Sequence, residues 1–572
     1  MKQFLYSHRL FFAILILAAV LRFALLGAVP TAITGDELIY PTTARAILLT
    51  GHDITGTWNP LSVFAFRYPP GELQAELPYF IHVIGDSFLP FSLFSYRYPF
   101  AFLSVGIVAL MYLIAKKLFG THGAIFTGFL AAINPWFIVM GRTGYESTPA
   151  TFFYLLGLYI VIAYPDKLLY ALPVFMLGFY SYIGTKILFI PFIVMSLILS
   201  YKLHKKLQRN AVITICVLAV IFVGFFVSRM ATSGQSRLSD ILLPNAPEFA
   251  QKVDSIRKIS IPNPLLSVMV NKITMFGEHL MDKTFRIFSI SYLFSQGDNF
   301  FLQARHSFFY PVESIFIVLG LGALFTMNQG MFVILMAFIL LGAIPHVIHR
   351  TETDFSGHLA LMFPFIILVL GCGLSFIYTH ASKTYKQSVV LIFTIVYALS
   401  LGNFILVYFY QLPLQGAGDF QMRTLSKYLH LAREKHQEVF VYSTQGADIF
   451  KKYLVYTDRI QKDTIQTLAK PMKPDSPITF DGITFTSCDN SIDVASSSAV
   501  HIVSSLCGFP TKQTPTHTKL SRLSDGGTIF DIYNNDVCDR NTLSTYPSNI
   551  TLKDFAVEPM SASDFCTTYV SK

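Results

Sequence analysis

Long apolar runs recur along the chain and leave few folds open to it. A helix of about 18 or more apolar residues is long enough to cross a lipid bilayer. Of the 572 residues, 53% are hydrophobic and 13% are charged, whereas about a quarter of the residues of a soluble protein are charged. The pattern predicts an α-helical polytopic membrane protein. We expect about eleven transmembrane helices, near Leu10–Leu26, Phe91–Leu118, Gly123–Met140, Thr148–Tyr164, Leu168–Tyr182, Lys186–Tyr201, Ala211–Val227, Pro311–Thr326, Met331–Ile348, His358–Tyr378 and Ser388–Tyr410.

Basic residues in the short connections predict the orientation of these helices, because lysine and arginine are enriched in cytoplasmic loops. One side of the membrane would carry Lys2, Arg9, Lys116, Lys117, Lys167, Lys202, Lys205, Lys206, Arg209, Lys383 and Lys386. We assign that side, and the N-terminus, to the cytoplasm. The same excess accounts for the formal charge of +9 without a nucleic-acid partner. The first run is long for a signal peptide, so an uncleaved span is favoured over cleavage near Ala28.

The apolar runs end near residue 410, and the predicted division is a transmembrane module at 1–410 followed by a soluble domain at 411–572. An odd number of spans places this second domain outside the cytoplasm. Helices are expected at Phe420–Glu434 and Asp448–Tyr456 and a strand at Glu438–Ser443, which predicts a small α/β domain. It holds four cysteines, and disulfides would fit an oxidising exterior. Three pairings are possible among Cys488, Cys507, Cys538 and Cys566.

Two adjacent carboxylates, Asp36 and Glu37, follow the first apolar run. Acidic side chains where a helix leaves the membrane are costly to desolvate and are candidates for a functional site. The alternative is that Asp36 caps the next helix, with Glu37 in its first turn near the positive end of the helix dipole.

Further polar residues collect in the predicted outward loops, of which 27–90 and 228–310 are the longest. The candidates for binding a substrate are Arg67, Tyr68, Arg97, Arg142, Glu146, Asp298, Arg305, His306, His349 and Arg350. Simpler interpretations stay open: Arg97 and Arg142 at helix edges can reach out to lipid headgroups, and Glu146 can be a charge at a helix start. The histidines of Pro345–His358 match no compact metal-binding motif.

The second long loop contains two amphipathic stretches, Ala246–Ile256 and Pro264–Phe276. Both fit helices that lie along the membrane interface. Ordinary soluble loop helices fit these stretches equally well.

Carboxylates beside arginines and histidines at a membrane surface suit one kind of reaction. A carboxylate can remove the proton of an acceptor hydroxyl while a negatively charged group leaves. Arginine forks suit bidentate capture of a phosphate, and a lipid phosphate as leaving group would explain a site at the bilayer edge. The sequence has no Walker loop and no strand-following GxGxxG motif, so a soluble nucleotide donor is not indicated.

An ordered set of segments resembles a known family. The segments are Gly35–Tyr40, Ala44–Arg45, Arg67–Pro70, Arg97, Ala115–Gly120, Asn134–Trp136, Gly141–Glu146, Ser291–Asp298, Arg305–His306, Pro345–His346, Arg350 and His358–Pro364. Together they resemble the bacterial branch of the protein O-mannosyltransferase superfamily, which includes the aminoarabinose transferases of lipid A. The resemblance covers the chain as far as about Tyr410.

The resemblance implies the GT-C membrane glycosyltransferase fold and inverting transfer of a sugar, a hexose or a pentose, from a polyprenyl-phosphate carrier. Asp36 stands in the position of the catalytic base, and Glu37 would orient Asp36 or the acceptor. Arg67, Arg142 and Arg305 are the candidates for holding the lipid phosphate. No metal or other cofactor is expected to be required, because the acidic motif of the metal-dependent oligosaccharyltransferases is absent from the first loop.

The acceptor could be a protein, a lipid or a glycan at the outer membrane face. Two other functions compete. A lipid flippase would place ionisable residues near the bilayer midplane, often in two related halves of the chain, and neither feature is found in the sequence. A non-catalytic membrane scaffold with an exported binding domain would be indifferent to the loss of Asp36.

Overall fold

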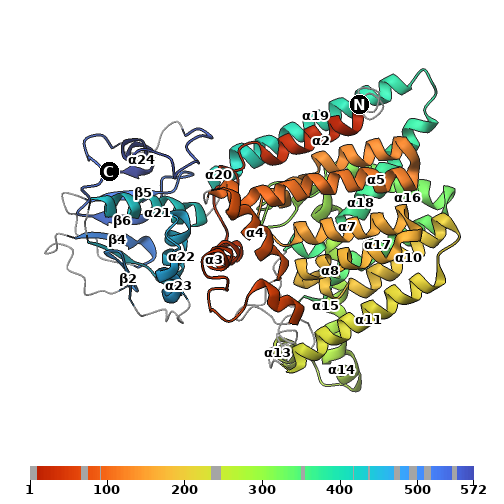
Figure 1. Cartoon of the computed structure of the whole chain (residues 1–572), viewed down its shortest axis with the longest axis horizontal. Helices are drawn as coiled ribbons and strands as arrows, with labels where there is room; N and C mark the ends of the chain where they lie inside the picture. Colours follow the sequence, from red (N-terminus) through yellow and green to blue (C-terminus); the bar gives the residue numbers. More distant parts are fainter. Residues whose placement is uncertain are drawn as a thin grey trace. The chain divides into compact units, whose positions relative to one another are not determined.

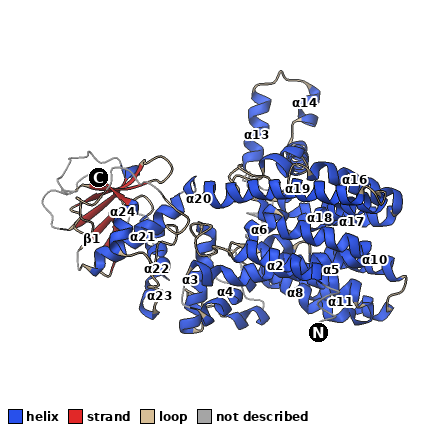
Figure 2. Ribbon diagram, turned by 90° about the horizontal axis from the view of Figure 1, so that it is seen from above, coloured by secondary structure: helices blue, strands red, loops and turns tan. Residues whose placement is uncertain are grey.

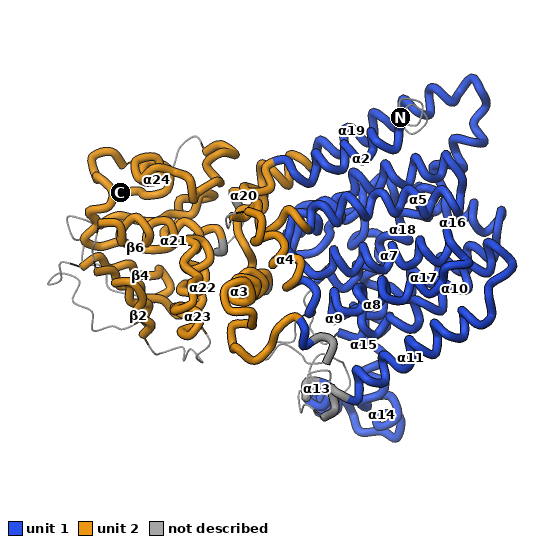
Figure 3. Tube along the Cα trace, in the orientation of Figure 1, with its two compact units in different colours: residues 1–24, 61–78, 100–404 blue, residues 25–60, 79–99, 405–572 orange. Residues whose placement is uncertain are grey.

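The computed structural model describes most of the chain. The described residues are 9–65, 75–89, 92–232, 247–349, 355–415, 418–435, 438–468, 477–488, 499–507, 517–543 and 550–572; within them the side chains of 35–36, 63–65, 229–232, 247–248, 415 and 418–419 are not described. The chain forms two compact units (Figure 3). Unit 1 comprises 1–24, 61–78 and 100–404, and unit 2 comprises 25–60, 79–99 and 405–572. The predicted division at residue 410 stays a prediction.

Unit 1 is a bundle of helices that run side by side (Figure 1). Its helices are α2 (Arg9–Phe23), most of α5 (Leu93–Ile133), α6 (Pro135–Gly141), α7 (Ser147–Ala163), α8 (Ala171–Ser181), α9 (Ile183–Lys186), α10 (Phe189–His204), α11 (Arg209–Thr232), α13 (Pro247–Lys258), α14 (Pro264–Met269), α15 (Lys272–Ile287), α16 (Glu313–Met327), α17 (Gln329–Ile348), α18 (Phe363–His380) and α19 (Lys386–Ile405). The predicted helical fold of this part is confirmed.

Five helical stretches of the described residues are long and apolar enough to cross a membrane. They are Leu93–Ile133, Arg209–Ser228, Gln329–Ile348, Phe363–His380 and Lys386–Leu414. The helices α7, α10 and α16 are apolar but shorter. The predicted number of eleven spans is therefore not confirmed.

Two predicted spans, Phe91–Leu118 and Gly123–Met140, lie largely within α5. The helix is interrupted at Gly120, whose φ of 74° and ψ of −166° are not helical. A positive φ costs glycine little because it has no Cβ atom, so Gly120 is where one apolar run ends and the next begins.

Close packing of small residues joins α16 to α18. A Cβ atom added to Gly320 would lie 2.2 Å from the Val369 carbonyl oxygen, and one added to Gly373 would lie 2.5 Å from that of Phe316. Only glycine allows the two backbones to approach this closely, as is common between membrane helices.

Unit 2 combines helices with one seven-stranded sheet, shown in red in Figure 2. The strand order is β2-β3-β1-β4-β6-β5-β7, with β2 at Ile478–Phe480, β3 at Ile483–Thr486, β1 at Val439–Tyr442, β4 at Val500–Ser504, β6 at Thr528–Tyr533, β5 at Thr518–Ser521 and β7 at Val570–Ser571. Strand β1 pairs in parallel with β3 and β4, and the other pairs are antiparallel.

The helices of unit 2 come from both ends of the chain. They are α3 (Gly35–Thr50), α4 (Leu77–Phe88, mostly in this unit), α20 (Leu412–Gln415), α21 (Gly418–Glu434), α22 (Gly446–Tyr456), α23 (Lys462–Leu468) and α24 (Ala562–Tyr569). The elements predicted at Phe420–Glu434, Glu438–Ser443 and Asp448–Tyr456 are confirmed as α21, β1 and α22. Disulfides join Cys488 to Cys507 and Cys538 to Cys566.

Candidate functional site

The acidic pair lies at the start of α3. Thr34 occupies the N-cap position, so the alternative in which Asp36 caps the helix is wrong. Glu37 closes a capping box: its Oε2 accepts hydrogen bonds from the Thr34 backbone N–H and hydroxyl, both at 3.1 Å. The Glu37 side chain is buried. The Asp36 backbone is helical, while its side chain lies outside the described part of the structure.

The segment that leads into α3 is held by the first turn of α5. The guanidinium of Arg97 donates hydrogen bonds to the carbonyl oxygens of Pro30 and Ala32, both at 2.6 Å, and of Leu26 at 3.4 Å. Arg97 is fully buried, so the alternative in which it reaches lipid headgroups is wrong. This geometry gives Arg97 the task of holding the backbone; its predicted contact with a donor phosphate stays a prediction.

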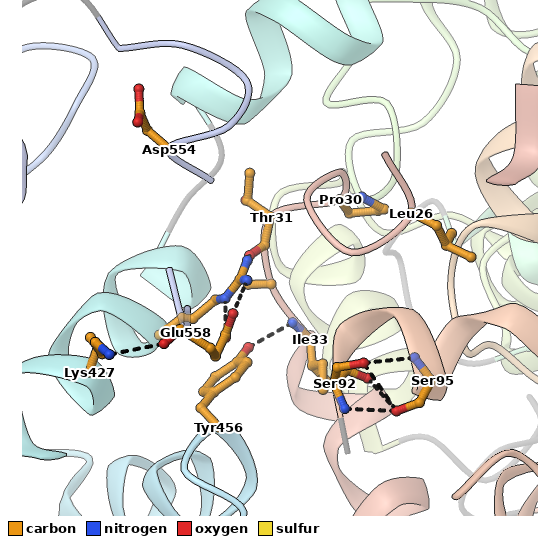
Figure 4. A network of polar contacts seen from close by, with 12 residues as sticks. Leu26, Pro30, Thr31, Ile33, Ser92, Ser95, Lys427, Tyr456, Asp554 and Glu558 are labelled. Atoms are coloured by element: carbon orange, nitrogen blue, oxygen red, sulfur yellow. Dashed lines mark hydrogen bonds and ion pairs between the residues drawn. The ribbon is translucent and has the colours of Figure 1, made fainter. Parts of the chain in front are cut away.

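The C-terminal domain holds the same segment from within unit 2 (Figure 4). One N–H of the Arg423 guanidinium donates to the Thr31 carbonyl at 2.5 Å. Its Nε and its second terminal nitrogen, Nη2, form a bidentate pair with Glu558, at 2.6 and 2.5 Å. Two residues after Thr31, the Ile33 N–H donates to the Tyr456 hydroxyl at 2.8 Å. The segment 31–33 is thereby fixed by residues about 400 positions later in the chain. Sequence patterns contain no signal for these contacts.

An aromatic layer packs beside α3. The ring of His82 stacks on that of Tyr96, with centroids 4.3 Å apart, and lies 5.8 Å from the ring of Tyr40. Tyr79 joins this layer, with its ring 5.1 Å from Tyr40 and 5.7 Å from Trp58. The Tyr96 hydroxyl also donates to the Glu37 carbonyl at 3.1 Å. The aromatic layer therefore packs against α3 and, through the Tyr96 hydroxyl, also fixes the position of the first turn of that helix.

Asp86 of α4, in unit 2, is buried near an ion pair. Arg45 of α3 pairs with Asp458 at 3.5 Å, and both interact electrostatically with Asp86 of α4. Neither carboxyl oxygen of Asp86 has a hydrogen-bond partner among the described residues. Burial raises the pKa of Asp86 to about 7; Arg45 opposes this rise and Asp458 adds to it.

In unit 1, Arg142 and Arg22 tie three helices together. Arg142 donates to the carbonyl oxygens of Leu21 and Arg22, both at 3.0 Å. Arg22 in turn donates to the Ser104 hydroxyl at 2.7 Å and to two carbonyls at the end of α5. Both arginines are fully buried, so the headgroup alternative is wrong for Arg142 too. Its predicted contact with a lipid phosphate is not tested by these bonds.

Glu146 stands at the N-cap position of α7, in keeping with the helix-start interpretation, and accepts a hydrogen bond from the Ala75 N–H at 3.2 Å. Next to Ala75, the Glu76 carboxylate accepts two hydrogen bonds from Lys186, both at 2.9 Å. Burial raises the pKa of Glu76, and Lys186 opposes that rise. The ammonium of Lys186 also lies 4.8 Å from the ring centroid of Phe226. The sequence pattern does not reveal this pair, because it marks Lys186 only as the start of a predicted span.

Asp298 is fully buried and organises its own loop. One carboxyl oxygen accepts from the N–H groups of Phe301 and Leu302 at 2.9 and 3.0 Å, and the other accepts from the Ser356 hydroxyl at 2.5 Å. Burial raises the pKa of Asp298, and these hydrogen bonds oppose the rise. In the same loop Arg305 is exposed, and burial lowers the pKa of His306.

Three histidines meet at the end of α17. The ring of His358 lies 4.3 Å from that of His349 and 6.2 Å from that of His346, between centroids. The Lys283 ammonium donates to the His349 carbonyl. Burial, and then the charge of Lys283, lower the pKa of His349 to about 4, so this imidazole is neutral at pH 7. Among the described residues, no group of three or more His, Cys, Asp or Glu side chains is arranged to hold a metal ion.

The remaining predicted residues, Arg67, Tyr68 and Arg350, lie outside the described residues. The structure brings Glu37 and Arg97 together around the entry to α3, in unit 2. It places Arg142, Glu146, Asp298, Arg305, His306 and His349 in unit 1. Their roles in binding a substrate stay predictions.

Comparison with known proteins gives two findings. Residues 77–228 match the family model "Dolichyl-phosphate-mannose-protein mannosyltransferase". The apo structure of ArnT from Cupriavidus metallidurans superimposes with a TM-score of 0.51 at 12% identity, over 92% of this chain and 98% of ArnT. This chain has the GT-C fold. The GT-C fold that the sequence resemblance implies is thus confirmed, while the predicted number of spans is not.

Other GT-C structures are similar at a lower level. ArnT from Cupriavidus metallidurans bound to undecaprenyl phosphate gives a TM-score of 0.49 at 13% identity, over 93% of this chain and 99% of that one. The oligosaccharyltransferase AglB from Archaeoglobus fulgidus, in complex with an inhibitory peptide and a dolichol-phosphate, gives 0.44 at 12% identity, over 79% of this chain. The chain spans only 64% of the length of that AglB. No curated protein sequence matches the chain significantly.

Proposed function

We propose that the chain is an inverting membrane glycosyltransferase that moves a sugar, a hexose or a pentose, from a polyprenyl-phosphate carrier to an acceptor hydroxyl. The GT-C fold supports this function, and the placement of Asp36 in the first turn of a braced helix, α3, carries the assignment of its base. The flippase alternative is not favoured, because the family that matches the chain consists of transferases.

In the proposed reaction the Asp36 carboxylate accepts the proton of the acceptor hydroxyl. The hydroxyl oxygen then bonds to the anomeric carbon of the donor sugar, and the bond from that carbon to the phosphate oxygen breaks. The lipid phosphate leaves with the bonding electrons, stabilised by cations, for which Arg67, Arg142 and Arg305 are the candidates. The acceptor is a protein, lipid or glycan hydroxyl.

We also propose an orientation of the chain in the membrane. The chain is a membrane protein with its N-terminus in the cytoplasm and its C-terminal domain outside. The two disulfides support an oxidising compartment for that domain, because thiols stay reduced in the cytoplasm.

Two neighbouring substitutions test the base. Asp36→Asn keeps the size of the side chain and removes the proton acceptor, so transfer should fall by about 10²–10⁴-fold. Glu37→Gln is the matched control, because a glutamine at this position of a capping box still accepts from the Thr34 N–H. We expect Glu37→Gln to keep transfer within about tenfold of wild type. The assay is release of polyprenyl phosphate from labelled donors by purified protein in lipid nanodiscs.

The controls separate chemistry from folding. Both variants should match wild type in thermal unfolding, because Asp36→Asn keeps the size of the side chain and Glu37→Gln keeps an acceptor for the Thr34 N–H. Unchanged turnover by Asp36→Asn would remove this residue from the mechanism. Mass spectrometry of envelope glycans, lipids and proteins from a deletion strain, complemented with each variant, would identify the acceptor.

A further inference from the structure

Residues 247–287 of the second long loop, 228–310, form a structured hairpin. Helices α13 and α15 pack on each other through Phe249, Val253 and Met275. The Arg257 guanidinium donates two hydrogen bonds to the Val270 carbonyl, at 2.9 and 2.6 Å, and so closes the base of the turn. The segment 259–273, called the hairpin tip below, therefore has a defined conformation.

The hairpin is attached to the C-terminal end of α17, a helix that is long and apolar enough to cross a membrane. Helix α15 packs on α17, and its Lys283 bonds to His349, directly after α17 ends at Ile348. From that attachment α13 and α14 extend away from the other helices of unit 1 (Figure 2). The hairpin tip thus projects from the end of the bundle at which α17 ends.

The hairpin tip is apolar and uncovered by the described residues. Ile259, Ile261 and Ile273 are 87%, 86% and 81% exposed, and α14 has no buried residue. A six-residue helix is far shorter than the roughly 12 residues that a helix needs to be even marginally stable alone in water. Exposed apolar side chains gathered in this way mark a surface that is covered by something else.

Charge identifies what covers it. Between residues 255 and 277 the chain has three basic residues, Arg257, Lys258 and Lys272, and no acidic residue. Arg257 and Lys258 directly precede the tip, and Lys272 lies near its end. Apolar side chains bordered by lysine and arginine are typical of elements that lie in the interface of a membrane with anionic lipids.

We propose that the hairpin tip inserts into the lipid leaflet beside the bundle, with Arg257, Lys258 and Lys272 at the level of anionic phospholipid headgroups. The tip anchors the loop 228–310 to the bilayer independently of the spanning helices. The proposal does not depend on the sugar-transfer function, because it uses only the exposure, charge and attachment of the hairpin.

Fluorescence of the full chain in vesicles tests the insertion. Ile261→Cys is labelled with an environment-sensitive dye after the two free cysteines, Cys216 and Cys372, are replaced by alanine. The vesicles contain phosphatidylcholine and about 30% phosphatidylglycerol, to supply anionic headgroups. Asp254→Cys on α13, an exposed polar position, is the matched control, and Leu265→Cys repeats the test within the hairpin tip.

Insertion predicts a blue-shifted dye at residues 261 and 265 that is quenched several-fold more strongly by spin labels on lipid acyl chains than the dye at 254. The dye at 254 should instead be quenched by aqueous iodide. Equal iodide quenching at 261 and 254 would overturn the proposal. Protection of 261 from both quenchers, with disulfide cross-linking between copies of the chain, would overturn it in favour of a protein interface.

Discussion

Arg423 offers the sharpest test of how the C-terminal domain supports the start of α3. Its side chain is almost fully buried and makes all three of its described hydrogen bonds within unit 2, one to the Thr31 carbonyl and two to Glu558. Thr31 lies five residues before Asp36. The substitution Arg423→Met removes the guanidinium group while keeping most of the aliphatic part of the side chain.

The loss of unfolding free energy follows from the two hydrogen-bond partners of Arg423, the Thr31 carbonyl and Glu558. The Thr31 carbonyl loses a buried donor, which costs about 1–3 kcal/mol. The Glu558 side chain is 38% exposed, so water can solvate it, and its pair with Arg423 contributes closer to the ~1 kcal/mol of an exposed pair. We therefore expect unfolding to become easier by about 2–4 kcal/mol. A shift of about 1 Å in the backbone before Asp36 would lower turnover by about 100-fold.

The assay compares kcat per folded molecule for wild type, Arg423→Met and Lys427→Met in nanodiscs, together with thermal unfolding. Lys427 is the control, since it donates to the Glu558 carbonyl at 2.9 Å but does not bond to Thr31. Lys427→Met should leave kcat near the wild-type value. If Arg423→Met turns over as fast as wild type per folded molecule, the bond to Thr31 does not position α3.

Three further predictions follow from buried charges and disulfides. The pKa of Asp86 is raised from 3.8 to about 7, so its ionisation should reduce stability as pH rises from about 4 to 7, by on the order of 4 kcal/mol; Asp86→Asn should flatten pH-dependent unfolding over that window. Lys186→Met should destabilise by about 3–5 kcal/mol because it strands the Glu76 carboxylate, and adding Glu76→Gln should recover most of the loss in a double-mutant cycle. Replacing Cys538 and Cys566 by alanine should lower unfolding stability by about 2–4 kcal/mol, which denaturant titration of the full chain would measure.

Patterns among neighbouring residues were enough to predict several helices and strands. The strand predicted at Glu438–Ser443 is found at Val439–Tyr442, because a short run of β-branched and aromatic residues is a property of adjacent residues. The helices α21 and α22 are found because the helical spacing of apolar residues is also a local pattern. Among the candidate site residues, the acidic pair at the start of a helix was recognisable, but the N-cap was Thr34, since caps depend on the backbone geometry of one residue.

Other features could not be read from neighbouring residues. Four cysteines left three pairings open, and the fold decided between them by bringing Cys488 to Cys507 and Cys538 to Cys566. For Asp298, a predicted substrate ligand, only the structure shows that its carboxylate accepts hydrogen bonds from the Phe301 N–H and the Ser356 hydroxyl.

By itself, the sequence determined that this chain is helical and apolar, because the free energy of burying a long apolar run depends only on that run. The tertiary structure decided how the segment 31–33, which leads into α3, is held. The partners there, Thr31 with Arg423 and Ile33 with Tyr456, are separated by 392 and 423 residues. Hydrogen bonds require atoms to lie within about 3 Å of each other, and only the folded chain brings such distant residues that close.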